Sequence, residues 1–161
     1  MKFYTISTDY VSFLKTVDAR VPNTQDPAYQ QQKIFVGVVL EIDGHKYLAP
    51  LTSYKPHQDK IKSSSPVSFK LHEKSNPDNK LGMINLKFMI PVLDSQIQLL
   101  DINSISGGYQ RMLYKQLEFI RVNKSMILKK AELLRHLVID KEQNFGSCNF
   151  ALLEEKYRSF I

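Results

Sequence analysis

The chain has little of what would hold together a small secreted protein or anchor a membrane protein. Its 161 residues include one cysteine, Cys148, and no tryptophan, so no internal disulfide can form and no zinc site can draw on several thiolates. The longest apolar runs, residues 34–40 and 88–93, are far shorter than the roughly 18–20 residues of a membrane-spanning helix. Because the first residues also lack the apolar segment of a signal peptide, we expect a cytoplasmic protein.

Motifs for cofactors and metals are missing as well. The sequence contains no glycine-rich loop that could cradle phosphates, and its four histidines do not follow a metal-ligand spacing (His45, His57, His72 and His136). We therefore predict neither a metal nor a nucleotide cofactor.

What the chain does contain is enough apolar material for one core and an uneven excess of positive charge. Hydrophobic residues make up 43% of the sequence, with 9 Phe and 8 Tyr, which at this length predicts a single folded domain spanning residues 1–161. The net charge is +6, and residues 109–136 alone hold seven basic and two acidic side chains. Such a segment favours a polyanionic partner.

The first half of the chain predicts a small, mostly antiparallel sheet. Residues 3–7 and 34–42 have the β-branched and aromatic content of strands. Asp43-Gly44 is a strong hairpin signal that returns residues 46–50 alongside the strand before it. Between the first two strands, Ser7 or Thr8 can cap a short helix whose apolar side carries Tyr10, Val11, Phe13 and Leu14.

Further strands are expected at residues 81–86, 88–93 and 97–102. Residues 60–80 are polar and predict a long, partly ordered loop with one strand-like piece near residues 69–71. From Tyr109 onward the apolar spacing becomes helical, and Asn149 can cap the last helix. The fold class is therefore α+β, with a helical C-terminal half.

The most informative local feature is the end of the returning strand, where Thr52, Ser53 and Lys55 follow an apolar segment. Hydroxyl and ammonium groups are suited to holding a phosphate, although these residue types are also common in turns. His57 lies near enough to suggest a general base, but a histidine in a loop is more often simply exposed.

One predicted helix carries basic and aromatic side chains together. Arg111 and Lys115 are four residues apart and share a face, with Tyr114 and Arg121 beside them. A solvated surface explains this pattern too, but stacking of bases on aromatic rings makes Tyr114 the better choice for an RNA contact than Phe119.

Five separated segments resemble one known family. They are residues 1–7 (MKFYTIS), 47–53 (YLAPLTS), 86–91 (LKFMIP), 111–117 (RMLYKQL) and 148–158 (CNFALLEEKYR). In this order they look like the ToxN/AbiQ family, the endoribonuclease toxins of type III toxin-antitoxin systems. The resemblance implies a compact, barrel-like antiparallel sheet related to the Kid and MazF toxins, with packed helices.

The resemblance also implies partners and a site. The family pairs each toxin with a repeated antitoxin RNA, folded as pseudoknots, that inhibits it in a closed toxin–RNA ring, and it cleaves adenine-rich cellular and phage RNA in abortive infection. Its active-site pattern matches six positions here, and its basic-aromatic helix matches Tyr114 and Lys115. The six are Tyr10, Tyr29, Lys33, Thr52, Ser53 and Lys55.

These residue types suit metal-independent cleavage, in which a ribose 2′-hydroxyl attacks the adjacent phosphate to leave a 2′,3′-cyclic phosphate and a 5′-hydroxyl. Lys33 and Lys55 are expected near the phosphate, with Thr52 and Ser53 as hydrogen-bond donors. Tyr10 and Tyr29 are expected to orient the RNA. The sequence does not decide which side chain is the base and which the acid.

Two other interpretations remain open from the sequence. A non-catalytic RNA-binding module explains the charge equally well but not the Thr52, Ser53 and Lys55 cluster. A toxin that inhibits a protein target leaves the basic helices without a role.

Overall fold

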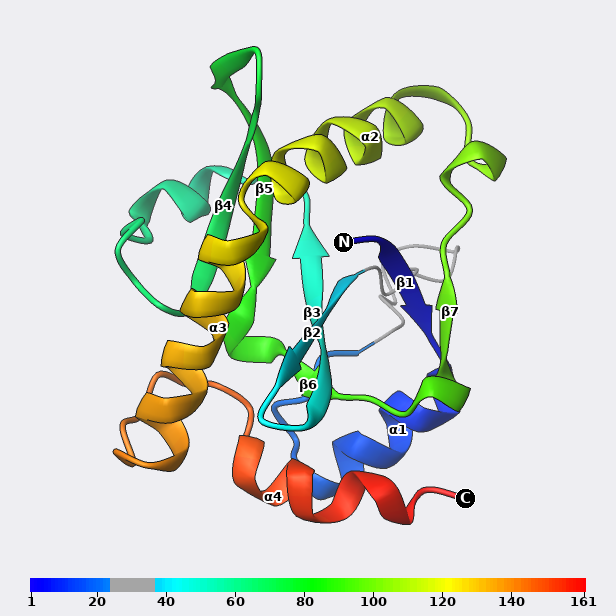
Figure 1. The fold of residues 1–161 in the computed structure, drawn as a ribbon, viewed down its shortest axis with the longest axis vertical. Coiled ribbons are helices and arrows are strands. Elements are labelled where there is room, and N and C mark those ends of the chain that lie inside the picture. The colour runs from blue at the N-terminus through cyan, green and yellow to red at the C-terminus, as the bar shows by residue number, and fades with distance from the viewer. Residues whose placement is uncertain (24–36) are drawn as a thin grey trace.

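A curled antiparallel sheet forms the centre of the molecule (Figure 1). The structure is a computed structural model and describes residues 1–23 and 37–161. The strands follow the order β4-β5-β3-β2-β1-β7, and β6 pairs with β3 beside this path. Their bounds are β1 Phe3–Ile6, β2 Gly37–Ile42, β3 His45–Thr52, β4 Ser68–Glu73, β5 Asn76–Asn85, β6 Ile90–Pro91 and β7 Ile97–Leu99.

In the part of the chain that the structure describes, four α-helices surround this sheet: α1 Thr8–Val17, α2 Gly107–Val122, α3 Lys124–Ile139 and α4 Phe150–Lys156. Helix α2 packs on β4 and β5, α3 contacts β2, and α4 contacts β6, α1 and α3. The predicted α+β class, the antiparallel sheet and the helical C-terminal half are confirmed. The sheet curls without closing, since β4 and β7 end its order within the described residues.

The N-terminal helix begins where the sequence predicts. Ser7 is the N-cap of α1, and its hydroxyl accepts a hydrogen bond from the backbone N–H of Tyr10 at 3.4 Å, which satisfies one of the free donors at a helix start. Tyr10, Val11 and Leu14 are buried, so the predicted apolar side faces the core.

The Asp43-Gly44 hairpin is also confirmed. Both residues have positive φ, 49° and 78°, as a tight turn matched to the twist of its strands requires. The turn sets the register of β2 and β3 from the Ile42–His45 pair to the Gly37–Pro50 pair. The strand β3 therefore ends at Thr52, at the end of the strand pair away from the Asp43-Gly44 turn.

The predicted loop at residues 60–80 holds for residues 61–67, and its strand-like piece at residues 69–71 lies in β4, but residues 76–80 belong to the strand β5. A 3₁₀ turn ends at Lys60, and β4 and β5 then form a hairpin that projects from the molecule. Residues 76–78, at the start of β5, are exposed, so this part of the hairpin has no buried face. Without a buried face it lacks the alternation of apolar and polar residues that marks a strand.

Two other predicted strands are much shorter than expected. Residues 88–93 contribute only the two residues of β6, because a 3₁₀ turn, Leu86–Phe88, redirects the chain after β5 and buries Leu86. Of residues 97–102, only β7 pairs with a neighbouring strand, β1. Their apolar side chains fill the core from turns as well as from strands.

The C-terminal helices bury most of their apolar positions, while Met112, Leu137, Val138 and Leu152 are only partly buried. Leu113, Leu117 and Ile120 of α2 are buried, whereas Tyr109 is 43% exposed. Asn149 caps α4 by accepting from the backbone N–H of Leu152 at 3.2 Å. Among the described residues, none of the helices has the length and apolar content needed to cross a membrane.

The only cysteine is a packing residue. Cys148 is fully buried, and burial raises the pKa of its thiol to about 12. A nucleophilic cysteine needs a lowered pKa and access to its substrate, so Cys148 serves the core and not catalysis.

Candidate functional site

The Thr52, Ser53 and Lys55 cluster lies at the C-terminal end of β3, as predicted. Thr52 is the last residue of the strand and pairs with Met83 of β5. Ser53 and Lys55 follow it and are exposed, and a 3₁₀ turn, Pro56–Lys60, comes next. The strand end thus holds two hydroxyl groups and an ammonium group at the surface.

A residue that sequence reasoning missed supports this cluster from below. The side chain of Gln58 is buried, with 3% of the residue exposed. Its Nε2 donates to the carbonyl oxygen of Ser53 at 2.8 Å and to Oγ1 of Thr52 at 3.3 Å. Because Thr52 accepts this bond, and its own contact to the Met83 carbonyl is long at 3.5 Å, its proton is available to a ligand.

Asp59 ties the same turn to two neighbours. Its carboxylate accepts from the Tyr54 hydroxyl at 2.6 Å and from Nζ of Lys80 at 2.9 Å. These hydrogen bonds hold the pKa of Asp59 below its usual value. Lys80 also lies 5.2 Å from the centre of the Tyr54 ring, so the strand β5 and the turn after β3 brace one another.

The strand β5 comes unusually close to the cluster at Gly82. Its φ is +121°, and a Cβ atom there would lie 1.9 Å from the carbonyl oxygen of Thr52. Only glycine permits this approach. The position of the Thr52 backbone therefore depends on a residue that is far away in the sequence.

Beside the cluster the surface is hollowed into a cavity of about 260 Å³. Thr52, Lys55 and His57 line it, together with Ser68 of β4 and Asn85 of β5. His57 is exposed. The structure thus brings the histidine that the sequence singled out to the same cavity as Thr52 and Lys55.

The remaining members of the predicted active site are distributed differently. Tyr10 is fully buried, its hydroxyl donates to the carbonyl of Pro91 at 2.6 Å, and its ring packs edge-on against Phe160. It has no surface to offer an RNA, so the prediction that Tyr10 orients the substrate is wrong: this tyrosine holds α1 against β6. Tyr29 and Lys33 lie outside the described residues.

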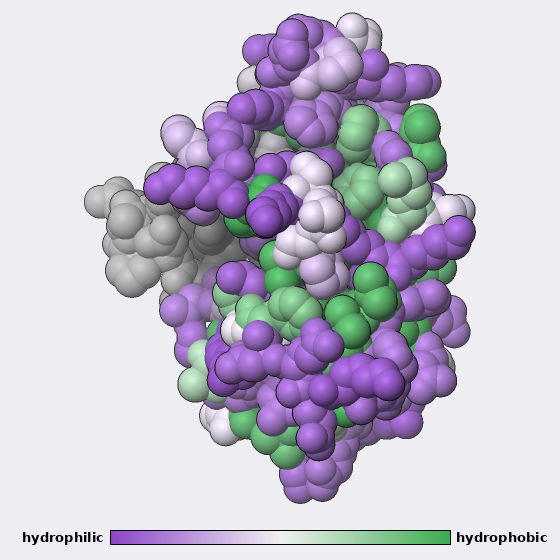
Figure 2. All heavy atoms as spheres, turned by 90° about the vertical axis from the view of Figure 1, so that its left-hand side faces the viewer, coloured by the Kyte–Doolittle hydropathy of each residue, from purple (hydrophilic) through white to green (hydrophobic). Residues whose placement is uncertain are grey.

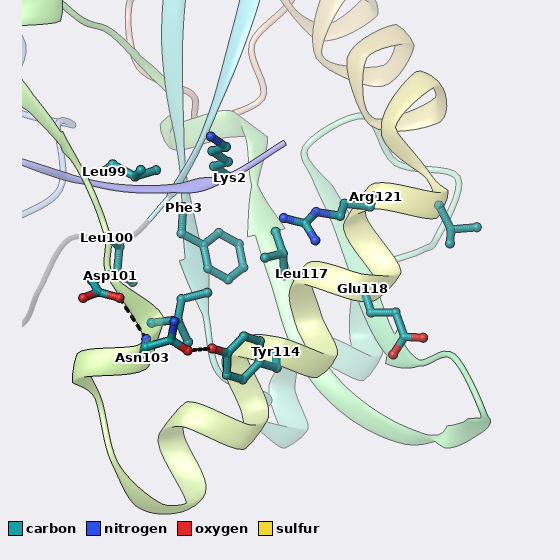
Figure 3. A pocket seen from close by; sticks show the side chains of 12 residues that line it. Lys2, Phe3, Leu99, Leu100, Asp101, Asn103, Tyr114, Leu117, Glu118 and Arg121 are labelled. Atoms are coloured by element: carbon teal, nitrogen blue, oxygen red, sulfur yellow. Dashed lines mark hydrogen bonds between the residues drawn. The ribbon is translucent and has the colours of Figure 1, made fainter.

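A second, larger hollow of about 640 Å³ runs between α2 and the segment after β7 (Figure 3). Tyr114 and Arg121 line it from α2, together with Phe3 and Leu117. The Tyr114 hydroxyl is hydrogen-bonded to Oδ1 of Asn103, which fixes its ring, and 44% of the residue stays exposed. An aromatic ring and a guanidinium group that line the same hollow suit the binding of an unpaired base and its phosphate.

The other two basic residues of the predicted helix face differ from each other. Lys115 forms an ion pair with Glu73 at 3.1 Å, so its charge is partly offset. Arg111 is exposed, and no ion pair joins it to another side chain in the described parts of the chain. Arg111 therefore has more of its positive charge available for a phosphate than Lys115 has.

The side of the molecule that carries β4 and α3 is largely hydrophilic, with hydrophobic side chains between its two ends (Figure 2). Lys130 belongs to the basic segment, but its Nζ donates to the carbonyl of Ser63 at 2.7 Å. Its pKa is lowered, mainly because the ammonium group is partly buried and also because the charge of Lys70 is near. Arg135 is held by Glu154. Part of the basic segment at residues 109–136 therefore serves the fold.

Residues 1–23 and 37–161 contain no group of three or more His, Cys, Asp or Glu side chains placed to hold a metal ion. The polar groups that converge at the end of β3 are instead hydroxyls, amides and amines. They are suited to binding a phosphodiester and part of a nucleotide.

The hydroxyl-and-lysine cluster at the end of β3 and the basic, aromatic surface of α2 have the chemistry of a protein that binds RNA. The family model described as "Toxin ToxN, type III toxin-antitoxin system" matches residues 2–158. The chain belongs to this family.

Individual relatives agree along nearly the whole chain. It is 55% identical to the endoribonuclease ToxN of Pectobacterium atrosepticum, covering 99% of this chain and 94% of the relative. A solved structure from work on a processed non-coding RNA that regulates a bacterial antiviral system has a TM-score of 0.92 at 55% identity and covers 99% of both chains.

A further solved structure comes from work on selective toxin inhibition by a non-coding RNA pseudoknot in type III systems. It has a TM-score of 0.80 at 30% identity, covering 98% of this chain and 96% of the other. The family and the endoribonuclease relative identify this chain as an endoribonuclease, which decides against a non-catalytic RNA-binding module.

Proposed function

We propose that this endoribonuclease cleaves single-stranded, adenine-rich RNA at the end of β3, with Thr52, Ser53 and Lys55 as its described catalytic residues and Lys33 as a further one. The observation that carries the proposal is the buried Gln58, which holds Thr52 and the Ser53 backbone in place at the surface. A buried side-chain amide that holds an exposed strand end in place is typical of a preorganised site.

The proposed reaction needs no metal ion. The 2′-hydroxyl of a ribose attacks the neighbouring phosphorus, its proton passes to a base, and the 5′-oxygen leaves with a proton from an acid. This breaks the P–O5′ bond and gives a 2′,3′-cyclic phosphate and a 5′-hydroxyl. The hydroxyls of Thr52 and Ser53 donate to the non-bridging oxygens, and Lys55 offsets the growing negative charge.

We assign inhibition to a structured antitoxin RNA with repeated pseudoknots, which binds the toxin directly and closes a ring of toxins and RNA units. The solved relative inhibited by a non-coding RNA pseudoknot supports this assignment. Here Arg111, Tyr114, Lys115 and Arg121 present charge and an aromatic ring on α2, and the hollow that Tyr114 and Arg121 line shares no residue with the cavity beside Thr52. Release of the toxin from this RNA during phage infection would abort that infection.

Cleavage and RNA binding can be separated in one experiment. The protein, purified free of RNA, is incubated with an adenine-rich RNA in excess EDTA beside its Ser53→Ala variant, and the ends of the products are analysed. We expect cyclic phosphate ends from the wild type and at least a hundredfold slower cleavage by Ser53→Ala, with unchanged affinity for a pseudoknot RNA.

The control is Ser64→Ala, an exposed serine in the turn before β4, which should cleave like the wild type. Full activity in Ser53→Ala would move the active site elsewhere. Product ends with a 5′-phosphate would contradict the proposed chemistry but not the location of the site.

A further inference from the structure

The cavity beside Thr52 contains a buried hydroxyl that no other part of the described structure uses. Ser68 is 3% exposed and lines the cavity, and its Oγ has no hydrogen-bond partner in residues 1–23 and 37–161. Leaving a buried hydroxyl unpaired costs free energy. Such groups are retained where a ligand completes them.

Asn85 brings a second polar group to the same place. It lies opposite Ser68 in the β4–β5 pairing, is 8% exposed and lines the cavity. Its side-chain amide offers a donor and an acceptor side by side, a pattern that matches the edge of a nucleobase. The pairing register of two strands thus places a hydroxyl and an amide together at the cavity wall.

The remaining lining of the cavity combines apolar side chains with Lys55 and Lys87 as cations, beside Thr52, His57 and Gln58. Ile61, Val67, Met83 and Phe88 supply the apolar lining, and Nζ of Lys87 lies 4.9 Å from the centre of the Phe88 ring. At about 260 Å³ the cavity is below the ~300–1,000 Å³ of pockets that enclose drug-sized ligands. Its size and lining fit one flat heterocycle.

The geometry points to this cavity as the subsite for the nucleobase next to the scissile phosphate, with Ser68 and Asn85 as the residues that select the base. The inference rests on the proposed cleavage site, because Thr52 and Lys55 belong both to that site and to the cavity. A nucleotide whose phosphate meets Thr52 and Lys55 can place its base against Ser68 and Asn85, since base and phosphate are joined through one ribose.

Binding can be tested without any cleavage. Met83 lines the cavity, whereas Met126 is 61% exposed on α3. In the protein labelled with methyl-13C methionine, each of the four 5′-nucleoside monophosphates is titrated while both signals are followed by NMR. We expect the Met83 signal to move with an affinity that depends on the base, and the Met126 signal to stay in place.

Two variants assign the selectivity. Ser68→Ala should weaken binding of the preferred nucleotide about threefold to tenfold without lowering the melting temperature, since the hydroxyl it removes is unpaired. Asn85→Leu, which has a similar shape but no polar atoms, should weaken that binding about tenfold and abolish the preference among bases. Ser64→Ala is the matched control and should change neither property.

Cleavage of a randomised RNA pool completes the test. In the wild type one position beside the cut should show a base preference, and both variants should flatten that preference while the neighbouring positions keep theirs. The inference would be overturned if no nucleotide moved the Met83 signal, or if inorganic phosphate moved it as much as a nucleotide does. It would also be overturned if all four nucleotides moved the signal with the same affinity. A protein that binds nucleotides here but cleaves no RNA would instead overturn the proposed function and leave the base subsite standing.

Discussion

At the scale of single residues, the candidate site depends on one buried amide. Gln58 donates to the Ser53 carbonyl and to Thr52 Oγ1, but it is a positioning residue because it lies beneath the strand end. We expect Gln58→Leu to lower kcat by about tenfold to a hundredfold, since small misplacements of catalytic groups are costly. KM should change little.

Gln110→Leu is the matched control, because Gln110 also donates its amide to a backbone carbonyl, that of Ile102 at 3.2 Å, but from α2. Steady-state kinetics on a short RNA, with melting temperatures for both variants, make the comparison. If both variants lost kcat equally, Gln58 would contribute to the stability of the fold and would not position the catalytic groups.

Sequence patterns predict the exposed members of the site better than the buried ones. The position of Thr52, Ser53 and Lys55 at a strand end follows from the hairpin signal and the strand length. Tyr10 was assigned to RNA by resemblance, although its helical spacing with Leu14 equally fits a core position, and the core position is the one observed. Gln58 gave no signal, because a glutamine in a turn is usually exposed.

At the scale of elements, the approach of β5 to the end of β3 sets the geometry of the site. We expect Gly82→Ala to destabilise the protein by about 2–4 kcal/mol and to reduce cleavage sharply, because the new Cβ would lie 1.9 Å from the Thr52 carbonyl oxygen. Denaturant unfolding and kcat measure the two effects.

Gly44→Ala provides the comparison. Gly44 also has a positive φ, +78°, but nothing lies within 4 Å of its Cβ position. The Gly44→Ala substitution should lower the free energy of unfolding by about 1 kcal/mol and leave the kcat of the folded protein unchanged. If Gly82→Ala behaves in the same way as Gly44→Ala, the contact with Thr52 does not position the site.

The β4–β5 hairpin marks the limit of prediction for elements. Its inner half carries Phe69, Leu71 and Met83, all buried, and residues 69–71 did suggest a strand. Its outer half is polar on both sides, so the strand there is specified by pairing with its neighbour and not by burial. A single sequence reveals burial patterns more readily than pairing partners.

At the scale of the whole molecule, the distribution of charge predicts how RNA binding responds to salt. Arg111 has no ion pair among the described residues, whereas Lys115 is paired with Glu73 at 3.1 Å. In a Ser53→Ala background, Arg111→Gln should reduce the slope of log K against log salt by about 0.9 for a duplex contact, or about 0.7 for a single strand. Lys115→Gln should have a smaller effect.

The control is Lys46→Gln, which removes a lysine at the opposite end of β3 that pairs with Asp94 at 2.8 Å. Affinities for a pseudoknot RNA at several salt concentrations give the slopes. A slope for Arg111→Gln equal to that of its parent would mean that the α2 surface is only solvated.

The end of the molecule opposite the site is held by a partly buried ion pair that should make stability depend on pH. Nε and Nη2 of Arg135 donate to the two oxygens of Glu154 at 2.7 and 2.9 Å, and the Tyr47 hydroxyl donates to the same carboxylate. This joins α3, α4 and β3. Burial opposes ionisation of Glu154, but the hydrogen bonds from Arg135 and Tyr47 outweigh it and lower the pKa of this carboxyl from its ordinary value of 4.5.

A lowered pKa in the folded state means that the stabilisation is complete above about pH 4.5 and is lost as the pH falls through the folded-state pKa. Glu154→Gln should therefore cost about 3 kcal/mol of unfolding free energy at neutral pH, and the difference from wild type should shrink in acid. Glu155→Gln removes a neighbouring carboxylate that is 67% exposed and pairs with Lys156, and it should cost at most about 0.5 kcal/mol. Urea unfolding between pH 3 and pH 7 gives the unfolding free energy of the wild type and of both variants. If the difference between the wild type and Glu154→Gln stays constant over this range, the carboxylate charge does not stabilise the fold.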